Sequence, residues 1–169
     1  MSEELERILA RLTEPDNAVI QQATGELKQT FKDPAIIPAL CAVMTGSQNP
    51  QVRQSAAVML RMRVRKHWKK ISPDHRESLK AVVLQALQQE TEHTVRHSLS
   101  QLSAVLVKHE TPDRWPALLA LLNQSTKAVT HRIDRWSFYC LAKWWDQTRS
   151  PLSPTTSNFS SCLGLFSKT

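Results

Sequence analysis

A short pattern that occurs twice, 43 positions apart, strongly limits what this chain can fold into. The sequence QVRQS (residues 51–55) recurs as TVRHS (94–98), and PALCAVM (38–44) is similar to PALLALL (116–122). Helix-pair repeats of the HEAT and armadillo kind have a period of roughly 40–47 residues. Because a single helix pair cannot cover its own apolar face, such repeats stack and bury a continuous core between them. The pattern therefore predicts a solenoid.

Apolar residues at helical spacing support this prediction along most of the chain. The segment SEELERILARL offers Ser2 as an N-cap, followed by Glu3 and Glu4 in the positive first turn. No segment alternates like a β-strand. We therefore expect an all-α fold, a HEAT-repeat-type α-solenoid of three to four antiparallel helix pairs. The segments with helical spacing are 2–12, 15–33, 33–50, 53–70, 74–90, 93–109 and 111–125.

Composition restricts the environment and the class of partner. The 169 residues include three cysteines without close spacing, and no N-terminal apolar segment of the secretory kind is present, so we expect a reducing compartment. The apolar runs are too short for a transmembrane helix, so we expect no membrane partner. The formal net charge of +7 favours acidic partners without identifying one.

Four segments together carry a resemblance to a known family. They read QQATGELKQ (21–29), PALCAVM, QVRQSAAVMLRMRVRKHW (51–68) and KHETPDRWPALLALL (108–122). Their order and spacing resemble the N-terminal domain of the importin-β, or karyopherin-β, nuclear transport receptors. The resemblance covers residues 5–122, and it is specific as a set rather than through any one segment.

The resemblance implies a receptor that carries proteins through nuclear pores and responds to the GTP-bound form of the GTPase Ran. In this family the inner helices of the N-terminal repeats form a main Ran-binding surface. Those helices end here near Phe31, Lys66 and Lys108. The resemblance further implies a monomer without a cofactor that occurs in cytoplasm and nucleus, with protein cargo and nucleoporins as partners of a longer form.

A polar and basic stripe on the helix that begins near residue 51 is the candidate Ran-binding site. Gln54, Arg61 and Arg65 lie apart from the apolar side of this helix, and Lys66 follows them. The basic run to Lys70 is also compatible with a solvated helix end, or with contact to an acidic protein. Direct nucleic-acid binding is disfavoured because a single aromatic residue accompanies the run, and a targeting signal is disfavoured because apolar residues interrupt it.

Arg53 and Arg96 follow the repeated valines and are interpreted as a structural ladder between neighbouring repeats. A buried arginine needs paired acceptors more than it needs a ligand. Asn49 and Glu90 are the candidate acceptors for these side chains.

Other patterns that could carry chemistry are weak. His93 and His97 have the i, i+4 spacing of zinc ligands, but no third ligand is evident, so we expect no metal site. The chain contains no glycine-rich phosphate loop, and we expect no enzyme activity. The alternative functions are a basic binder of nucleic acid or acidic protein, and an inactive truncated product.

The composition changes near residue 133, where the resemblance fails. Three of the five tryptophans fall within residues 136–145, and a segment rich in Ser, Thr and Pro follows. We therefore divide the chain into importin N-terminal repeats (1–132), a divergent segment that is a possible helix (133–149) and a disordered tail (150–169). Because this end is foreign to the family, we interpret the chain as a truncated or alternatively spliced product.

Overall fold

A computed structural model describes residues 1–110, 115–118 and 120–121. Expectations for a fourth helix pair, for residues 133–149 and for the tail lie outside this described part. No helix in it combines the length and the apolar character needed to cross a membrane. Its principal helices are α1 (Ser2–Arg11), α2 (Asn17–Thr30), α3 (Ile36–Gly46), α4 (Pro50–His67), α5 (Pro73–Gln89) and α6 (His93–His109), with a short 3-10 helix, η1 (Trp68–Lys70), after α4.

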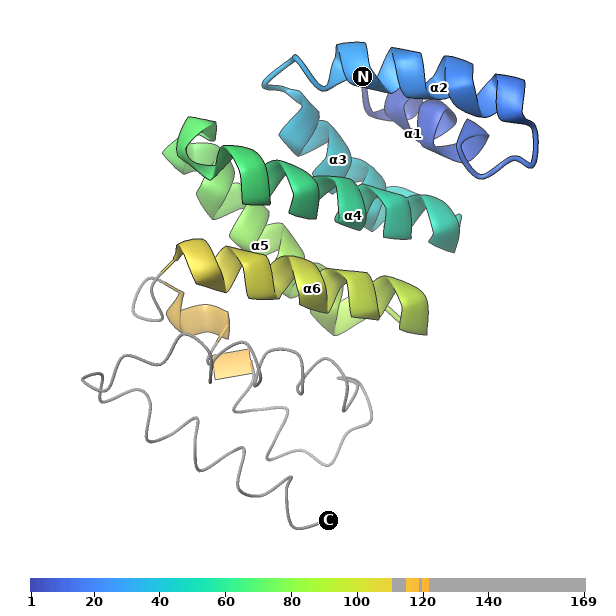
Figure 1. The fold of residues 1–169 in the computed structure, drawn as a ribbon. Helices are drawn as coiled ribbons and strands as arrows, with labels where there is room; N and C mark the ends of the chain where they lie inside the picture. The colour runs from blue at the N-terminus through green and yellow to red at the C-terminus, as the bar shows by residue number, and fades with distance from the viewer. Residues whose placement is uncertain (111–114, 119, 122–169) are drawn as a thin grey trace.

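The helices form three stacked antiparallel hairpins, and the expected all-α, HEAT-like architecture is confirmed (Figure 1). The first helices, α1, α3 and α5, make one layer, and the second helices, α2, α4 and α6, make the other. The packing is uneven along the stack. Helix α4 packs against α1, α3 and α6, whereas α2 packs mainly against α1.

The core is a continuous layer of aliphatic side chains between the two helix layers, as stacked repeats require. Full burial of one such side chain contributes about 1.5–3 kcal/mol. Cys41 belongs to this layer, and burial raises the pKa of its thiol to about 12, so the thiol stays protonated at neutral pH. Fully buried members include Leu5, Leu9, Ile36, Leu40, Met44, Leu60, Leu79, Leu99, Leu102 and Leu106.

Side-chain caps begin three of the helices where the sequence breaks its apolar spacing. Asp16, Asn49 and Ser72 each accept a hydrogen bond from a backbone N–H in the first turn of α2, α4 and α5. The prediction that Ser2 caps α1 was wrong. The carbonyl of Met1 already accepts the first helical bond from the Leu5 N–H, at 3.0 Å, which places Ser2 inside the helix.

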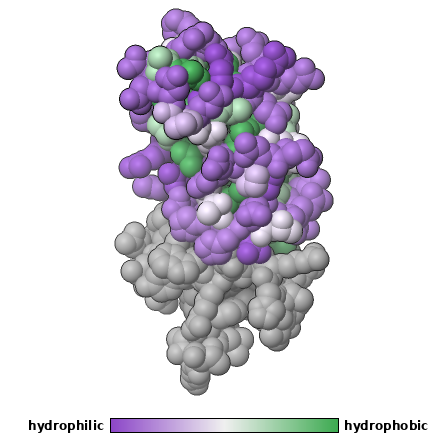
Figure 2. All heavy atoms as spheres, turned by 90° about the vertical axis from the view of Figure 1, so that its right-hand side faces the viewer, coloured by the Kyte–Doolittle hydropathy of each residue, from purple (hydrophilic) through white to green (hydrophobic). Residues whose placement is uncertain are grey.

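The edge of the stack that carries the turns within the hairpins is mainly hydrophilic. Figure 2 views the molecule from that side, and the hydrophobic colour is confined to small areas between the helices. This edge therefore presents hydrogen-bonding groups rather than an apolar face.

Candidate partner-binding surface

The predicted binding residues lie on α4, and the sequence stabilises both ends of this helix. The Asn49 side chain accepts a hydrogen bond from the Gln51 N–H at 3.0 Å. Pro50 occupies the first turn, where its missing N–H has no intrahelical partner to lose. Arg65 and Lys66 lie in the last turn, next to the partial negative charge of the helix C-terminus. The long basic helix is therefore compatible with its own dipole.

The structure brings three of the four predicted residues together and separates the fourth. At 3.6 residues per turn, Gln54, Arg61 and Arg65 fall within about 40° of one another around the α4 axis. Lys66 lies about 100° further round than Arg65. Gln54 and Arg61 are half-buried, whereas Arg65 and Lys66 are exposed. We call Gln54, Arg61 and Arg65 the inner stripe.

The inner stripe is joined to the neighbouring inner helix through Arg61. The Arg61 guanidinium donates a hydrogen bond to the side-chain oxygen of Gln101 on α6. The Gln101 amide nitrogen lies 3.0 Å from the His97 ring nitrogen, one turn earlier on α6. Sequence reasoning missed Gln101, although its i, i+4 spacing from His97 placed the two on one face. Any partner bound at Arg61 therefore also meets α6.

An exposed methionine adds apolar surface beside the stripe. Met62 is 47% exposed, and Val58, one turn earlier, is half-buried. Both lie within about 60° of Arg65 around the helix. Met62 was not among the residues predicted from the sequence, although the two methionines in the run MLRMR were a usable signal. The surface thus combines positive charge with apolar area, a composition found in protein interfaces.

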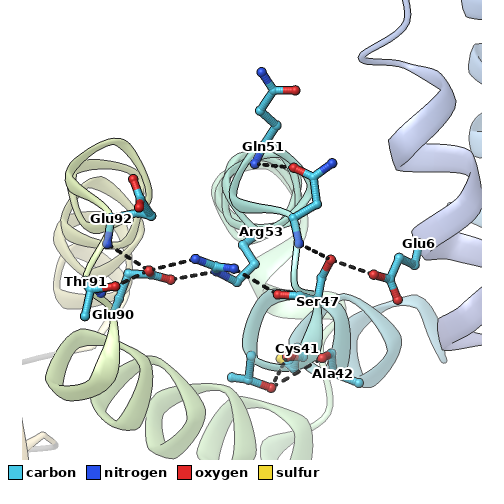
Figure 3. Close-up of polar contacts among 11 residues, drawn as sticks. Glu6, Cys41, Ala42, Ser47, Gln51, Arg53, Glu90, Thr91 and Glu92 are labelled. Atoms are coloured by element: carbon cyan, nitrogen blue, oxygen red, sulfur yellow. Dashed lines mark hydrogen bonds and ion pairs between the residues drawn. The ribbon is translucent and has the colours of Figure 1, made fainter.

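At 100° per residue, Arg53 lies on the opposite side of the stripe from this apolar pair. Figure 3 shows that its side chain links hairpins. Its Nε donates to Glu90 Oε2 at 2.9 Å, and its Nη2 donates to Glu90 Oε1 at 3.0 Å. Its Nη1 donates to the Ser47 carbonyl at 2.9 Å. The two charged side chains are only 15% and 8% exposed. The guanidinium is therefore occupied by structural contacts.

The same contacts continue to the first hairpin. The Ser47 hydroxyl donates to Glu6 Oε1 at 2.5 Å, so a connected chain runs from α1, through the α3–α4 turn, to the α5–α6 turn. We call Glu6, Ser47, Arg53 and Glu90 the polar ladder. Asn49, also considered as an acceptor for Arg53, instead caps α4.

Burial and hydrogen bonds act in opposite directions on the pKa of the Glu90 carboxyl. Burial acts to raise the pKa of its carboxyl, but the hydrogen bonds from Arg53 and from the Thr91 and Glu92 N–H groups outweigh it. The net pKa is below the ordinary value, so Glu90 is ionised at neutral pH. Arg96 occupies the position on α6 that corresponds to Arg53 and is half-buried.

A shallow cleft of about 270 Å³ lies beside the polar ladder, between the C-terminal ends of α3 and α5. Its lining is mostly polar, and it contains the Arg53–Glu90 pair. Because these two charges are already paired with each other, the cleft offers no free charge for a ligand. The remaining polar side chains of its lining are Thr45, Ser47, Gln48, Gln89 and Thr91.

At the opposite end of α4, Trp68 packs where three helices meet. The side chain is 8% exposed, and the His109 ring stacks on it with centroids 5.5 Å apart. The Arg76 guanidinium lies 4.9 Å from the centre of the tryptophan ring and donates to the Trp68 carbonyl at 3.0 Å. Burial, together with Lys108 and Arg76, lowers the pKa of His109. Trp68 therefore closes this end of the hairpin by packing.

The basic run ends at the surface. Lys66, Lys69 and Lys70 are exposed, and none of them takes part in the ion pairs formed within the described residues. The pKa of His67 is lowered by burial and by the positive charges of Arg63, Lys70 and Lys66. We call Arg65, Lys66, Lys69 and Lys70 the basic end. It is a solvated cluster that has positive charge to offer an acidic partner.

The histidine pair on α6 was the only metal pattern in the sequence. Within residues 1–110, 115–118 and 120–121, no three His, Cys, Asp or Glu side chains are grouped as metal ligands would be. His97 instead lies against Gln101.

Comparison with known proteins agrees with this geometry. Residues 23–89, which extend from α2 to the end of α5, match the model of the importin-beta N-terminal domain. The chain is 44% identical over 122 residues to importin-4 of Mus musculus and 45% identical over 115 residues to importin-4 of Homo sapiens. It is 31% identical over 140 residues to the probable importin subunit beta-4 of Schizosaccharomyces pombe.

These alignments cover most of this chain but only a small part of each relative. These alignments include 72%, 68% and 82% of this chain, respectively. They include 11%, 11% and 13% of the relatives. The chain therefore spans a small fraction of the length of the curated relatives that it matches.

Proposed function

The chain belongs to the importin-β family, and we propose that it is the N-terminal portion of a nuclear import receptor that binds Ran-GTP through its inner helices. The inner stripe on α4 is the proposed contact. The observation that carries this proposal is the hydrogen bond from Arg61 to Gln101, which makes α4 and α6 one continuous polar surface.

The chemistry of that surface suits a protein partner with acidic and apolar groups. Arg65 is exposed beside Met62, so one contact area can supply both an ion pair and apolar burial. Arg53, by contrast, is engaged with Glu90 and is not proposed as a partner contact. Lys66 extends the positive potential rather than the contact area, because it lies away from the stripe.

The proposed mechanism is differential binding. Ran-GTP and cargo bind the same spiral with unequal affinity for its conformations, so that one partner displaces or loads the other. A chain of three described hairpins supplies the Ran-facing part of this scheme. Protein cargo and nucleoporins are proposed partners of a longer form, with cytoplasm and nucleus as its locations.

The test is a calorimetric titration of the chain, at near-physiological salt, with Ran bound to a non-hydrolysable GTP analogue and separately to GDP. We expect binding to the GTP form alone. Arg65→Glu should weaken that binding at least about tenfold, because it reverses an exposed contact charge. Arg65 makes no ion pair with another described residue, so the fold should persist.

The matched control is Arg7→Glu, which makes the same charge change at an exposed site on α1. It should leave the affinity within about twofold. Equal binding of both nucleotide forms, or equal losses in the two variants, would count against the inner stripe as a Ran surface. Far-ultraviolet circular dichroism of each variant would verify that the helices are intact.

A second candidate function rests on the basic end, whose lysines form no ion pair with another residue of the described part of the chain. This end could hold an acidic protein or nucleic acid outside any transport role. Phosphate-driven binding falls steeply with salt because counterions are released, whereas an interface with an apolar centre falls less. A titration of single-stranded oligonucleotide at several salt concentrations would distinguish the two functions.

A further inference from the structure

An exposed serine at the basic end has the features of a modification site. Ser72 is exposed and is followed directly by Pro73. These two residues come shortly after the basic lysines and lie at the start of α5. We propose that Ser72 is phosphorylated by a proline-directed protein kinase, and that phosphoserine at this position acts as a charge switch on the basic end. The effect on partner binding rests on the proposed function, whereas the modification itself does not.

The backbone at this serine is extended over two residues, between η1 and α5. Ile71 has φ −78° and ψ 129°, and Ser72 has φ −61° and ψ 150°, so both residues are extended. A Ser-Pro step presents no N–H after the serine, and this is the feature that proline-directed kinases select. The chain contains two other Ser-Pro steps, at residues 150–151 and 153–154, and a Thr-Pro step at 111–112, but the step at Ser72 alone has both residues in the described part.

The reaction is an ordinary phosphoryl transfer with a nucleoside triphosphate as co-reactant. The Ser72 Oγ attacks the γ-phosphorus, the new Oγ–P bond forms, and the bond from that phosphorus to the bridging oxygen breaks. The hydroxyl proton passes to the catalytic base of the kinase, and the nucleoside diphosphate leaves. The chain itself needs to supply only an accessible hydroxyl.

The electrostatic consequence follows from the surroundings. Residues 61–76 carry seven Lys and Arg side chains and one carboxylate, Asp74. A phosphoserine carries about −1.5 to −2 charges at neutral pH. Lys69 and Lys70 precede it by three and two residues and have no ion-pair partner within the described part of the chain. The modification would thus cancel a large share of the exposed positive charge.

The fold should tolerate the added group. The Ser72 Oγ accepts from the His75 N–H at 3.4 Å, and a phosphate oxygen can accept the same hydrogen bond. The negative charge also lies beside the partial positive charge of the α5 N-terminus. Phosphorylation of Ser72 should therefore change partner binding and leave α5 folded.

The modification is tested by incubating the full chain with a recombinant proline-directed kinase and MgATP, with a standard substrate peptide in the same tube. Tryptic digestion releases residues 71–76, and mass spectrometry measures phosphate on that peptide. We expect phosphate at Ser72 in the wild type, none in Ser72→Ala, and at least about tenfold less in Pro73→Ala. An unmodified 71–76 peptide beside a fully modified standard would overturn the proposal.

The switch is tested by titrating Ran-GTP into the phosphorylated and unmodified chains at low and high salt. Phosphorylation should weaken binding about fivefold at low salt, with the difference shrinking as salt screens it. Gln85→Glu, an acidic change at an exposed site further along α5, should have little effect. Equal affinities of the two chains would overturn the switch.

Failure of the proposed Ran-GTP binding can be distinguished from failure of the phosphorylation and of the charge switch. If the unmodified chain does not bind Ran-GTP, the phosphate at Ser72 is still scored by mass spectrometry. The charge switch is then scored on immobilised heparin, an acidic polymer. The phosphorylated chain should elute at lower salt than both the unmodified chain and Gln85→Glu, and identical elution of all three would overturn it.

Discussion

At the scale of single residues, Arg53 shows how one side chain can link hairpins. Its five N–H donors suit a planar fork, and the structure uses that fork on Glu90 while a further donor reaches the Ser47 carbonyl. Lysine could not satisfy this geometry with a single ammonium group. The pair is nearly enclosed, so its loss leaves a buried charge behind.

Replacing Arg53 should therefore destabilise the fold. We expect Arg53→Ala to lower the free energy of unfolding by about 3 kcal/mol, because Glu90 is left ionised and buried without its partner. Urea unfolding followed by circular dichroism measures this change. Arg65→Ala, which removes an exposed arginine from the same helix, should change it by no more than about 0.5 kcal/mol. Equal effects of the two changes would contradict the structural role of Arg53.

The same pair gives the stability a pH dependence. The pKa of Glu90 is lower in the folded chain than its ordinary value of 4.5. Ionised Glu90 therefore contributes its full free energy to the folded state above pH 4.5, and this contribution is lost as the pH falls through the pKa of Glu90 in the folded chain. Wild type should therefore exceed Glu90→Gln in urea midpoint at pH 7 and at pH 5, and the gap should narrow at lower pH. A gap that is independent of pH would show that ionised Glu90 is not the stabilising form.

The contacts of individual residues were only partly predictable from the sequence. The buried setting of Arg53 and Glu90 as its acceptor could be proposed, because a valine-arginine pair recurs at the repeat spacing. The contacts of Ser47 with Glu6 and of Arg61 with Gln101 could not. Each joins residues about 40 positions apart, and its geometry depends on how two hairpins stack, which periodicity within one helix does not specify.

At the scale of elements, the hairpins begin where local capping chemistry allows. The segment that ends at Pro50 was predicted to precede the next helix, whereas α4 begins at Pro50 with Asn49 as its N-cap. An N-cap residue followed by proline is a strong helix signal that would have located this start. The first helix was less predictable. Ser2 has the right chemistry for a cap, but the hydrogen bond from Leu5 to the Met1 carbonyl sets the start one residue earlier.

The cap of α4 makes a testable contribution. Asn49→Ala should lower the free energy of unfolding by about 1 kcal/mol, because the Gln51 N–H loses its side-chain acceptor. Asn49→Asp should be close to wild type, since a carboxylate accepts the same bond. Thermal or urea unfolding provides the measurement. If the aspartate variant were as unstable as the alanine variant, the cap would not be the source of the effect.

At the scale of the whole molecule, the helices of the stack differ in how many residues they bury and in how many neighbouring helices they contact. Helix α2 buries only Ala23 and Leu27 and packs mainly on α1, whereas α4 buries five residues and contacts three other α-helices. Local opening requires less free energy where fewer apolar contacts are lost. Both helices were predicted from apolar residues at helical spacing, which does not specify how much of each helix the neighbouring hairpins cover.

Hydrogen exchange measured by mass spectrometry should reveal that difference. Amides of α2 should exchange at least about tenfold faster than those of α4 and α6. Their exchange should also respond less to Arg53→Ala, because α2 makes no contact with the polar ladder among the hydrogen bonds of the described residues. Equal protection of α2 and α4 would indicate that the whole stack opens as a single unit.

The polar ladder also bears on how such a chain can change length over evolution. Arg53 finds its carboxylate acceptor, Glu90, at the turn of the next hairpin, in addition to the Ser47 carbonyl of its own. Arg96 recurs at the corresponding place on α6. We expect gain or loss of a complete hairpin to keep Arg53 opposite a turn, whereas an insertion within a hairpin displaces donor from acceptor. Gene rearrangements that respect the repeat boundary should leave foldable products, and those that cut through a hairpin should not.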